Sequence, residues 1–330
     1  MLLNWVYPFG KERSAVLFEP IRLSSGTASR VGLLPETSKD PSTTAYFMTG
    51  EKCRRACSFC SQGLSSTGRS DRLGRILWPA FKEEEAVTAV AQAMENGTVG
   101  RACFQVVNAN GALEQTERAL IPLMDSDKKV SITADLYSME QVDRFMALGV
   151  DQVALALDAA SERVSQTTKG GGFATRLALL EAAARKYPKR VTTHLIVGLG
   201  ETEEEMARLI AHLLSLQVTV ALFAFTPIAG TPDATKKPPQ MGHYRRMQAV
   251  HYLLLQEKIM KSDLTFVEGR LQLDWRHFQE ELQTGHAFQT TGCMDCNRPF
   301  YNERPGHVPY NYPRPLTADE GRTAFLALFS

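Results

Sequence analysis

Short apolar runs alternate with helical patterns along most of the chain, and this alternation constrains the fold more than any other feature. Seven runs rich in apolar, β-branched or aromatic residues are candidate buried strands: residues 45–49, 102–107, 130–134, 152–157, 192–197, 219–225 and 264–268. Between or after them, apolar residues recur every three or four positions over residues 81–96, 116–123, 138–148, 174–186, 203–216 and 244–259. About seven such units in succession predict an α/β fold, a full or nearly full parallel (βα) TIM-type barrel with its chemistry at the carboxyl ends of the strands.

The chain divides into a barrel and two extensions. Residues 1–43 carry many Gly, Ser, Pro and Thr residues without sustained periodicity, so we expect an N-terminal extension lying over the main fold. The barrel is expected over residues 44–282. The whole chain of 330 residues is 44% apolar, which suffices for one large core. Residues 283–330 are loop-rich until a short helix expected near residues 318–328.

Charge and cysteine usage exclude several classes of protein. Lys plus Arg total 37 against 36 for Asp plus Glu, so no overall field favours nucleic acid. The apolar run at the N-terminus is short and is interrupted by Asn4 and Pro8, which predicts neither a signal segment nor a membrane span. Five of the six cysteines fall in two short groups, which favours metal thiolates in a reducing compartment and therefore a cytoplasmic location.

One of these groups has the spacing of a metal site. Cys53, Cys57 and Cys60 form a C-x3-C-x2-C motif directly after the first predicted strand. Three thiolates leave one iron of a four-iron cubane open to a non-protein ligand. A zinc knuckle or a fully ligated cluster is the alternative, but residues 44–75 hold no fourth Cys or His.

The motif resembles the signature of the radical S-adenosylmethionine (SAM) superfamily, in which an aromatic residue precedes the last cysteine, as Phe59 does here. The resemblance implies a [4Fe–4S] cluster held by the three cysteines, with the amino and carboxylate groups of SAM on the open iron. It also implies reductive cleavage of SAM to a 5′-deoxyadenosyl radical that abstracts hydrogen. A scaffolding or electron-relay subunit that binds the cluster without catalysis is a second interpretation.

The resemblance implies SAM contacts at three further positions. Asp158 ends the fourth predicted strand, where related enzymes place a polar group near the SAM ribose; the alternative is that it caps the following helix. Ile196 begins IVGLGET (residues 196–202) and would pack on adenine. Asn108 stands where a Gly-Gly-Glu motif usually contacts the methionine amine, but NANG (residues 108–111) departs from that pattern, so backbone carbonyls are the candidates there.

Within the superfamily, RACFQVV, IVGLGET, GTP (residues 230–232) and VEGR (residues 267–270) look most like the biotin synthase branch. Biotin synthase holds a sacrificial auxiliary cluster with three cysteines and an arginine inside the barrel. Cys103 and Arg270 match two of those places, whereas Ser131 and Thr192 stand at the other two. Half of the ligand set is therefore missing, which argues against biotin synthase itself. Cys103 could also be only a small buried strand residue.

Replacement thiolates are offered by Cys293 and Cys296, a C-x2-C pair expected to cover the barrel mouth. Their context, GCMDCNRPFYNERPG followed by YNYPRPL, is similar to the two-component, archaeal-type lipoyl synthases. A structural zinc pair completed by His286 or His307 is the alternative. The arginines of this region, Arg298, Arg304 and Arg314, either anchor a loop or grip an acidic carrier domain.

These resemblances imply radical SAM sulfur insertion into an octanoyl chain on a lipoyl carrier domain or peptide, with an auxiliary iron–sulfur cluster as sulfur donor. The expected partners are the octanoylated carrier, a second radical SAM subunit and an electron donor such as ferredoxin or flavodoxin, with no nucleic acid and no membrane. Thiolation of dethiobiotin, or radical SAM chemistry without sulfur insertion, is the alternative.

Overall fold

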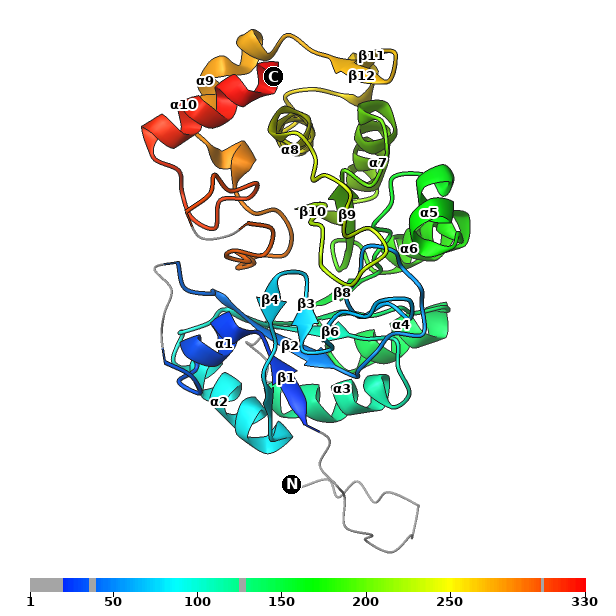
Figure 1. Ribbon diagram of the computed structural model, residues 1–330, viewed down its shortest axis with the longest axis vertical. Coiled ribbons are helices and arrows are strands. Elements are labelled where there is room, and N and C mark those ends of the chain that lie inside the picture. Colours follow the sequence, from blue (N-terminus) through cyan, green and yellow to red (C-terminus); the bar gives the residue numbers. More distant parts are fainter. Residues whose placement is uncertain (1–19, 36–39, 125–128, 304–305) are drawn as a thin grey trace, which may run out of the picture.

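The computed structural model describes residues 20–35, 40–124, 129–303 and 306–330. Its main sheet has eight strands in the order β10-β9-β8-β7-β6-β2-β1-β5 (Figure 1). Six of them run parallel: β2 (Thr44–Thr49), β6 (Arg101–Val106), β7 (Lys129–Thr133), β8 (Gln152–Ala154), β9 (Val191–Val197) and β10 (Thr219–Ala224). Strands β1 (Ile21–Leu23) and β5 (Ala80–Phe81) extend the β2 edge in antiparallel pairing. The parallel α/β, TIM-barrel-like class is therefore confirmed, with an open side between β10 and the β1–β2 edge.

The seventh predicted strand does not join this sheet. Strand β11 (Thr265–Val267) pairs with β12 (Arg270–Gln272) in a separate antiparallel hairpin. Glu268 and Gly269 between them both have positive φ, of 49° and 75°, so the chain turns back at once. The first and last residues of β11 are exposed, so its apolar appearance marks a surface hairpin rather than a buried parallel strand.

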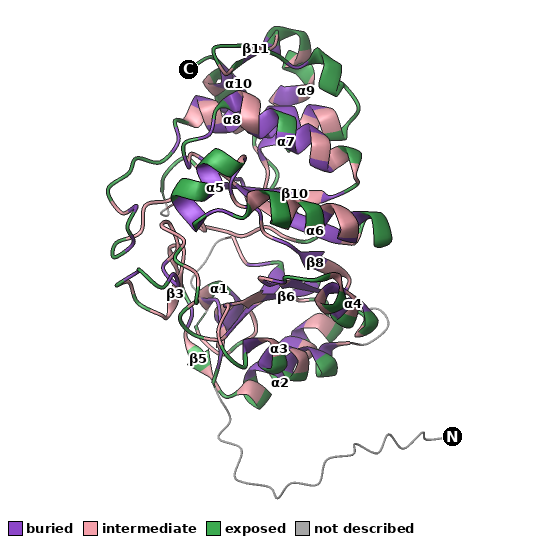
Figure 2. Ribbon diagram, turned by 90° about the vertical axis from the view of Figure 1, so that its right-hand side faces the viewer, coloured by how far each residue is buried: buried purple, intermediate pink, exposed green. Residues whose placement is uncertain are grey.

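Helices cover the outer face of the sheet, and their buried sides face inward (Figure 2). The six predicted helices are confirmed as α2 (Glu83–Glu95), α3 (Ala112–Leu120), α4 (Met139–Ala147), α6 (Phe173–Lys186), α7 (Glu203–Ser215) and α8 (Met241–Leu255), and the terminal helix as α10 (Ala318–Leu326). The structure adds helices α1 (Ser25–Arg30), α5 (Glu162–Lys169) and α9 (Gln279–Gln283), the hairpin β3 (Arg72–Leu73)–β4 (Ile76–Leu77), and 3₁₀ turns η1 (Ile121–Leu123), η2 (Lys261–Asp263), η3 (Trp275–Phe278), η4 (His286–Phe288) and η5 (Ala327–Phe329). Within the described residues, no helix has both the length and the apolar character needed to cross a membrane.

Alternate residues of each parallel strand face opposite sides, as the pleat requires. One set packs under the helices; Phe47 and Phe104, for example, stack there with ring centroids 4.6 Å apart. The other set lines a central cavity and consists of Thr44, Tyr46, Arg101, Cys103, Gln105, Ser131, Thr133, Ala154, Thr192, His194, Ile196, Ala221 and Phe223. Because this second set is largely polar, the interior of the barrel is shaped to hold something other than a close-packed core.

The C-terminal extension covers the open side of the barrel. It follows the edge strand β10, where the backbone N–H of Leu222 donates to Thr291 Oγ1 at 2.8 Å and Asn302 Nδ2 donates to the Ala224 carbonyl at 2.6 Å. On its other side, Asn297 Oδ1 accepts from the backbone N–H of Thr43 at 3.0 Å, just before β2 begins. In Figure 1 this segment runs between β10 and the strands around β2. The extension thus bridges the two edges that a closed barrel would pair directly.

Buried Arg245 of α8 fixes the extension from behind. Its guanidinium donates to the carbonyls of Pro309, at 2.6 Å, and Tyr310, and it lies 5.2 Å from the centre of the Phe288 ring. Burial lowers the pKa of Arg245 to about 10, which leaves it charged at neutral pH. The contacts of this buried charge hold Phe288, Pro309 and Tyr310 of the extension against α8.

Candidate functional site

Cys53, Cys57 and Cys60 lie in a loop of tight turns that follows β2, at the carboxyl end of that strand. The loop is closed by backbone hydrogen bonds from Cys53 N to the Gln62 carbonyl at 2.8 Å and from Gly63 N to the Cys60 carbonyl at 3.0 Å. A Cβ at Gly63 would lie 2.8 Å from the Cys57 carbonyl oxygen, so only glycine fits there. The three thiols all line the same central cavity.

The donor set of this loop fits a cluster better than a single metal ion. No group of three or more His, Cys, Asp or Glu side chains among the described residues is arranged to hold one ion. In a cubane each thiolate binds a different iron, so its ligands need not converge on one point. Burial raises the pKa of Cys57, and that of Cys60 to about 12, so a cation must be present for these groups to be thiolates.

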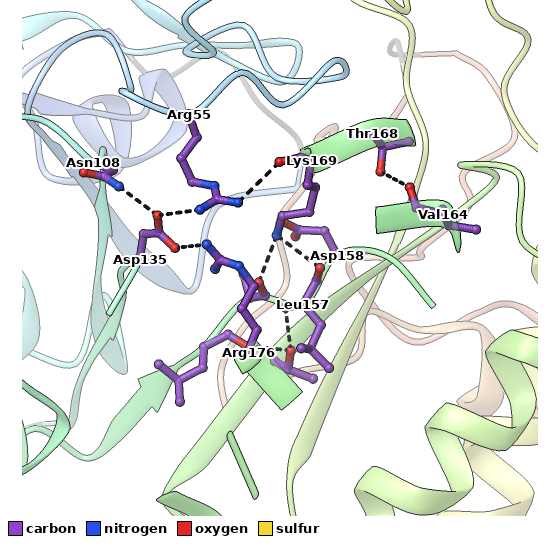
Figure 3. A network of polar contacts seen from close by, with 12 residues as sticks. Arg55, Asn108, Asp135, Leu157, Asp158, Val164, Thr168, Lys169 and Arg176 are labelled. Carbon is purple, nitrogen blue, oxygen red and sulfur yellow. Dashed lines mark hydrogen bonds and ion pairs between the residues drawn. The ribbon is translucent and has the colours of Figure 1, made fainter. Parts of the chain in front are cut away.

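Asp158 is held beside this loop by an ion pair with Lys169, at the end of α5 (Figure 3). Its backbone lies in the left-handed region, with φ of 61°, and bridges to β9 through hydrogen bonds of 2.8 Å with the His194 carbonyl and the Ile196 N–H. The side chain of Ser161, not that of Asp158, caps α5, so the interpretation of Asp158 as a helix cap is wrong. Asp158 instead faces the cavity at the carboxyl end of β8.

A second set of polar groups joins the cluster loop to the ends of β6 and β7 (Figure 3). Asp135 pairs with Arg176 and accepts from Asn108 Nδ2 at 2.8 Å, while Arg55 of the cysteine loop lies 3.8 Å from the same carboxylate. Burial acts to raise the pKa of Asp135, but the hydrogen bond from Tyr137 and the charge of Arg176 outweigh it and leave that pKa lowered. The carboxylate therefore stays ionised between two guanidinium groups.

The sequence did not single out Asp135, Arg176, Lys169 or Arg55. Asp135 follows the carboxyl end of β7, where catalytic residues are expected in this fold. That placement is the one feature of the sequence that could have identified it. The other three reach the site only because the cysteine loop, the end of α5 and the first turn of α6 converge there.

Phe59 and Ile196, both expected to contact SAM, share one apolar cluster next to the cysteine loop. They pack against buried Ala159, Val164, Leu199 and Phe225. Asn108 also lines the cavity, and its backbone carbonyl accepts from the Arg54 N–H at 2.9 Å. The structure thus brings Phe59, Asn108, Asp158 and Ile196 to the same end of the cavity as the three cysteines.

Cys103, Cys293 and Cys296 line the opposite part of the same cavity, whose volume is about 330 Å³. Strand register places Cys103 level with Tyr46 and Ser131, and Tyr46 Oη lies 3.4 Å from Cys296 Sγ. Burial, reinforced by the neighbouring thiols, raises the pKa of Cys103 to about 11 and that of Cys293 to about 12. Cys103 and Cys293 therefore also need a cation nearby if they are to serve as thiolates.

The segment that carries Cys293 and Cys296 lies at the amino ends of the strands. The Asp295 carbonyl accepts from Thr44 Oγ1 at 2.7 Å, and the Met294 carbonyl accepts from Arg101 Nε at 3.0 Å. Thr44 and Arg101 are the first residues of β2 and β6. The expectation that this pair covers the barrel mouth is therefore corrected, because the chain passes under the strands before it rises along β10.

Arg270 is not part of this site. It is exposed on the β11–β12 hairpin and lines a different pocket, with Glu203 and Arg246. The prediction that Arg270 occupies the place of the arginine ligand in biotin synthase is therefore wrong, because the chain has left the main sheet at that point. Ser131 and Thr192, which stand at the two unmatched places, do line the cavity with Cys103.

His286 and His307 are exposed and do not line the cavity, so the structure does not bring either to Cys293 and Cys296 as a zinc ligand. Arg298 donates to the Thr291 carbonyl at 2.8 Å, and Arg314 pairs with Glu320, which fits their role as loop anchors. Arg304 lies outside the described residues.

Comparison with known proteins agrees with this geometry. Residues 47–213 match the family model described as the radical SAM superfamily. A biotin synthase from Vesicomyosocius okutanii subsp. Calyptogena okutanii is 24% identical over 218 residues, which cover 63% of this chain and 65% of the relative. A mitochondrial lipoyl synthase from Coccidioides posadasii is 24% identical over 197 residues, covering 57% of this chain and 44% of the relative. The matches thus span less than two thirds of these relatives.

Two solved structures share the fold at low identity. HydG, a maturase of the [FeFe]-hydrogenase, aligns with a TM-score of 0.51 at 13% identity, covering 64% of this chain and 50% of that chain. Streptococcus suis SuiB bound to S-adenosylmethionine aligns with a TM-score of 0.51 at 15% identity, covering 67% of this chain and 49% of that chain.

A parallel α/β partial barrel with a three-cysteine loop at the carboxyl end of its first parallel strand defines a class of cluster-dependent SAM enzymes. The chain belongs to the radical SAM superfamily, in the branch whose relatives include biotin and lipoyl synthases. Membership implies a [4Fe–4S] cluster and SAM as cofactors, and Cys53, Cys57 and Cys60 fit the motif that holds them.

Proposed function

We propose that the protein inserts sulfur into unactivated C–H bonds of an octanoyl chain carried on a polypeptide, as a lipoyl synthase-like radical SAM sulfurtransferase. The observation that carries the proposal is one cavity with two sets of three thiols, Cys53, Cys57 and Cys60 toward the carboxyl ends of the strands and Cys103, Cys293 and Cys296 toward the amino ends. Hydrogen abstraction and sulfur donation need two separate metal groups near one substrate, and this arrangement offers a place for each.

The first set of thiols would hold the SAM-binding cluster. When bound, that cluster supplies the electron that splits SAM into methionine and a 5′-deoxyadenosyl radical, which takes a hydrogen atom from the substrate. Phe59 and Ile196 offer an apolar surface for the adenine ring, and Asp158, held in place by Lys169, offers an acceptor for ribose hydroxyls. Asn108 and Asp135 offer acceptors for the methionine amine.

The second set would hold an auxiliary iron–sulfur group through Cys103, Cys293 and Cys296. Such a group supplies sulfide for the new C–S bond and accepts the electron released as that bond forms. The alternative of a zinc pair loses support because neither His286 nor His307 reaches the cavity.

The wall between the two sets of thiols favours an apolar substrate chain. Four apolar side chains line the cavity there and pack with buried Met48: Leu73, Ile76, Trp78 and Val107. A radical has to meet its target bond away from water, and an apolar wall excludes water while it admits a flexible acyl chain. A carrier domain or peptide would remain outside the cavity, and ferredoxin, flavodoxin or a second radical SAM subunit would be additional partners.

The test is anaerobic incubation of the reconstituted protein with SAM, a strong reductant and an octanoyl-lysyl peptide. Mass spectrometry should find one or two sulfurs added, together with 5′-deoxyadenosine; a subunit of a split system would add only one sulfur. A double variant, Cys293→Ala with Cys296→Ala, should still form 5′-deoxyadenosine but should add no sulfur.

Two results would overturn the proposal. Thiolation of dethiobiotin, with none on octanoyl or mono-thiolated octanoyl peptides even when a partner subunit is supplied, would establish the biotin synthase-like alternative. SAM cleavage that is unaffected by substitution of Cys53, Cys57 or Cys60 would remove the cluster assignment on which the proposal depends.

A further inference from the structure

Arg101, at the start of β6, is a buried cation beside the second set of thiols. Its side chain is 3% exposed and lines the cavity together with Cys103, Cys293 and Cys296. Because Arg101 and Cys103 are two residues apart on one strand, their side chains emerge on the same face. The sequence indicates no role for Arg101, and Arg270, the arginine expected at this site, lies in a different pocket.

Two of the three nitrogens of the Arg101 guanidinium have partners. Nη2 pairs with Asp151 at 2.5 Å, and Nε donates to the Met294 carbonyl at 3.0 Å. Met294 lies between Cys293 and Cys296, so the second contact holds the backbone of the C-x2-C segment against β6. The arginine therefore fixes the position of two thiols relative to the third.

The remaining nitrogen, Nη1, is buried and has no hydrogen-bond partner. A buried donor without an acceptor costs about 1–3 kcal/mol, and more when the group is charged, so proteins keep few of them. Arg298 also lines the cavity, but it donates to the Thr291 carbonyl and its guanidinium stacks 4.0 Å from the centre of the Phe223 ring. The unsatisfied donor points to an acceptor that belongs among the three thiols.

We propose that Arg101 is a positioning residue of the auxiliary site, where Nη1 donates a hydrogen bond to a sulfur of the bound iron–sulfur group while Nε clamps the C-x2-C backbone. Sulfide and thiolate sulfurs of such a group are anionic acceptors that match a buried cationic donor. This inference deepens the proposed function and rests on its auxiliary site.

The fixed charge also has an electrochemical consequence. A cation that donates to a cluster sulfur stabilises the more negative, reduced state of the cluster, so it raises the reduction potential. Removing it should make the auxiliary group harder to reduce without affecting the SAM-binding cluster at the other end of the cavity.

The test compares Arg101→Met and Arg101→Lys with the wild-type holoprotein. Asp151 is 36% exposed, so water can solvate its carboxylate when the partner is removed, and circular dichroism checks that each variant folds. Lys129→Met is the matched control, because Lys129 also contacts Met294, through its Sδ at 3.0 Å, and is less buried. The readouts are iron and sulfide per chain, and EPR-monitored reduction of each cluster.

We expect Arg101→Met either to lose the second cluster selectively or to shift its reduction potential to more negative values. Arg101→Lys should fall between Arg101→Met and wild type, and Lys129→Met should match wild type. All three variants should retain 5′-deoxyadenosine formation.

Unchanged iron content and an unchanged potential in Arg101→Met would overturn the inference while leaving the auxiliary cluster itself intact. The inference would also be overturned if Arg298→Met shifted the reduction potential of the second cluster and Arg101→Met did not. A wild-type protein with one cluster only would instead overturn the proposed auxiliary site, and this inference with it.

Discussion

The ion pair between Lys169 and Asp158 offers a direct test of how the site is held together. Lys169 is 3% exposed, and its ammonium donates to Asp158 Oδ2 at 2.6 Å and to the carbonyls of Ala156 and Leu157 at 3.1 Å each. Lys169→Met keeps most of the volume but removes the charge and all three donors. Breaking a buried pair by deleting one partner typically costs ~3–5 kcal/mol.

The structure places this substitution at the low end of that range. Asp158 is 17% exposed, so water can reach part of its carboxylate once Lys169 is gone, and we expect a loss of about 3 kcal/mol in the free energy of unfolding. The measurement is anaerobic urea denaturation of preparations with equal iron content, compared at equal m-value. Lys186→Met, which breaks an exposed ion pair with Asp143, serves as the control and should leave the unfolding curve unchanged.

A double variant tests the physical reason for that loss. If the cost comes from an uncompensated carboxylate, Asp158→Asn combined with Lys169→Met should recover at least ~1 kcal/mol relative to Lys169→Met alone. A loss below ~1 kcal/mol in the single variant would refute the argument. No recovery in the double variant would refute it as well.

Two further perturbations test other parts of the structure. Gly63→Ala should lower cluster incorporation, because the new Cβ would lie 2.8 Å from the Cys57 carbonyl oxygen and 3.1 Å from that of Cys60. Gly26→Ala is the control. Its Cβ would lie 4.0 Å from the nearest atom, so this variant should keep the wild-type iron content. Burial lowers the pKa of His251 from 6.5 to about 4, so the unfolded chain binds the proton first and stability falls as the pH drops from 6.5 toward 4, by up to about 3 kcal/mol. In His251→Leu the free energy of unfolding should decline less steeply as the pH drops across that interval, because buried His194 still contributes its own decline. An equally steep decline in the variant would contradict this assignment.

Most of the fold could be predicted because each barrel strand carries a run of apolar residues and six of the helices around it show apolar residues every three or four positions. Helix α5 was missed because its sequence, ERVSQTTK, contains one apolar residue and offers no periodic face. Residues 264–268 were wrongly predicted as a barrel strand because a short hairpin strand can look as apolar as a buried one. Tertiary pairing, which the sequence does not display, decides between the two.

The candidate site likewise has a part that the sequence reveals and a part that only the folded structure reveals. The spacing of Cys53, Cys57 and Cys60 is a local property, so the sequence alone reveals it. The contact between Lys169 and Asp158 and the approach of Arg101 to Met294 join segments that only the folded chain brings together. The assignment of Arg270 as a ligand of the auxiliary cluster was wrong for the same reason. A ligand can be inferred from a relative only if the two chains follow the same path at that position.

The presence of two clusters with separate roles is tested most directly by the iron and sulfide content of the anaerobically reconstituted protein. Both are measured, with EPR spectra, before and after one turnover on an octanoyl-lysyl peptide. We expect two clusters per chain, about eight irons if both are cubanes. After one turnover, sulfide should be lost from the cluster at Cys103, Cys293 and Cys296, while the cluster at Cys53, Cys57 and Cys60 persists. Four irons with one zinc per chain, or two clusters whose sulfide is unchanged after sulfur appears in the product, would contradict it.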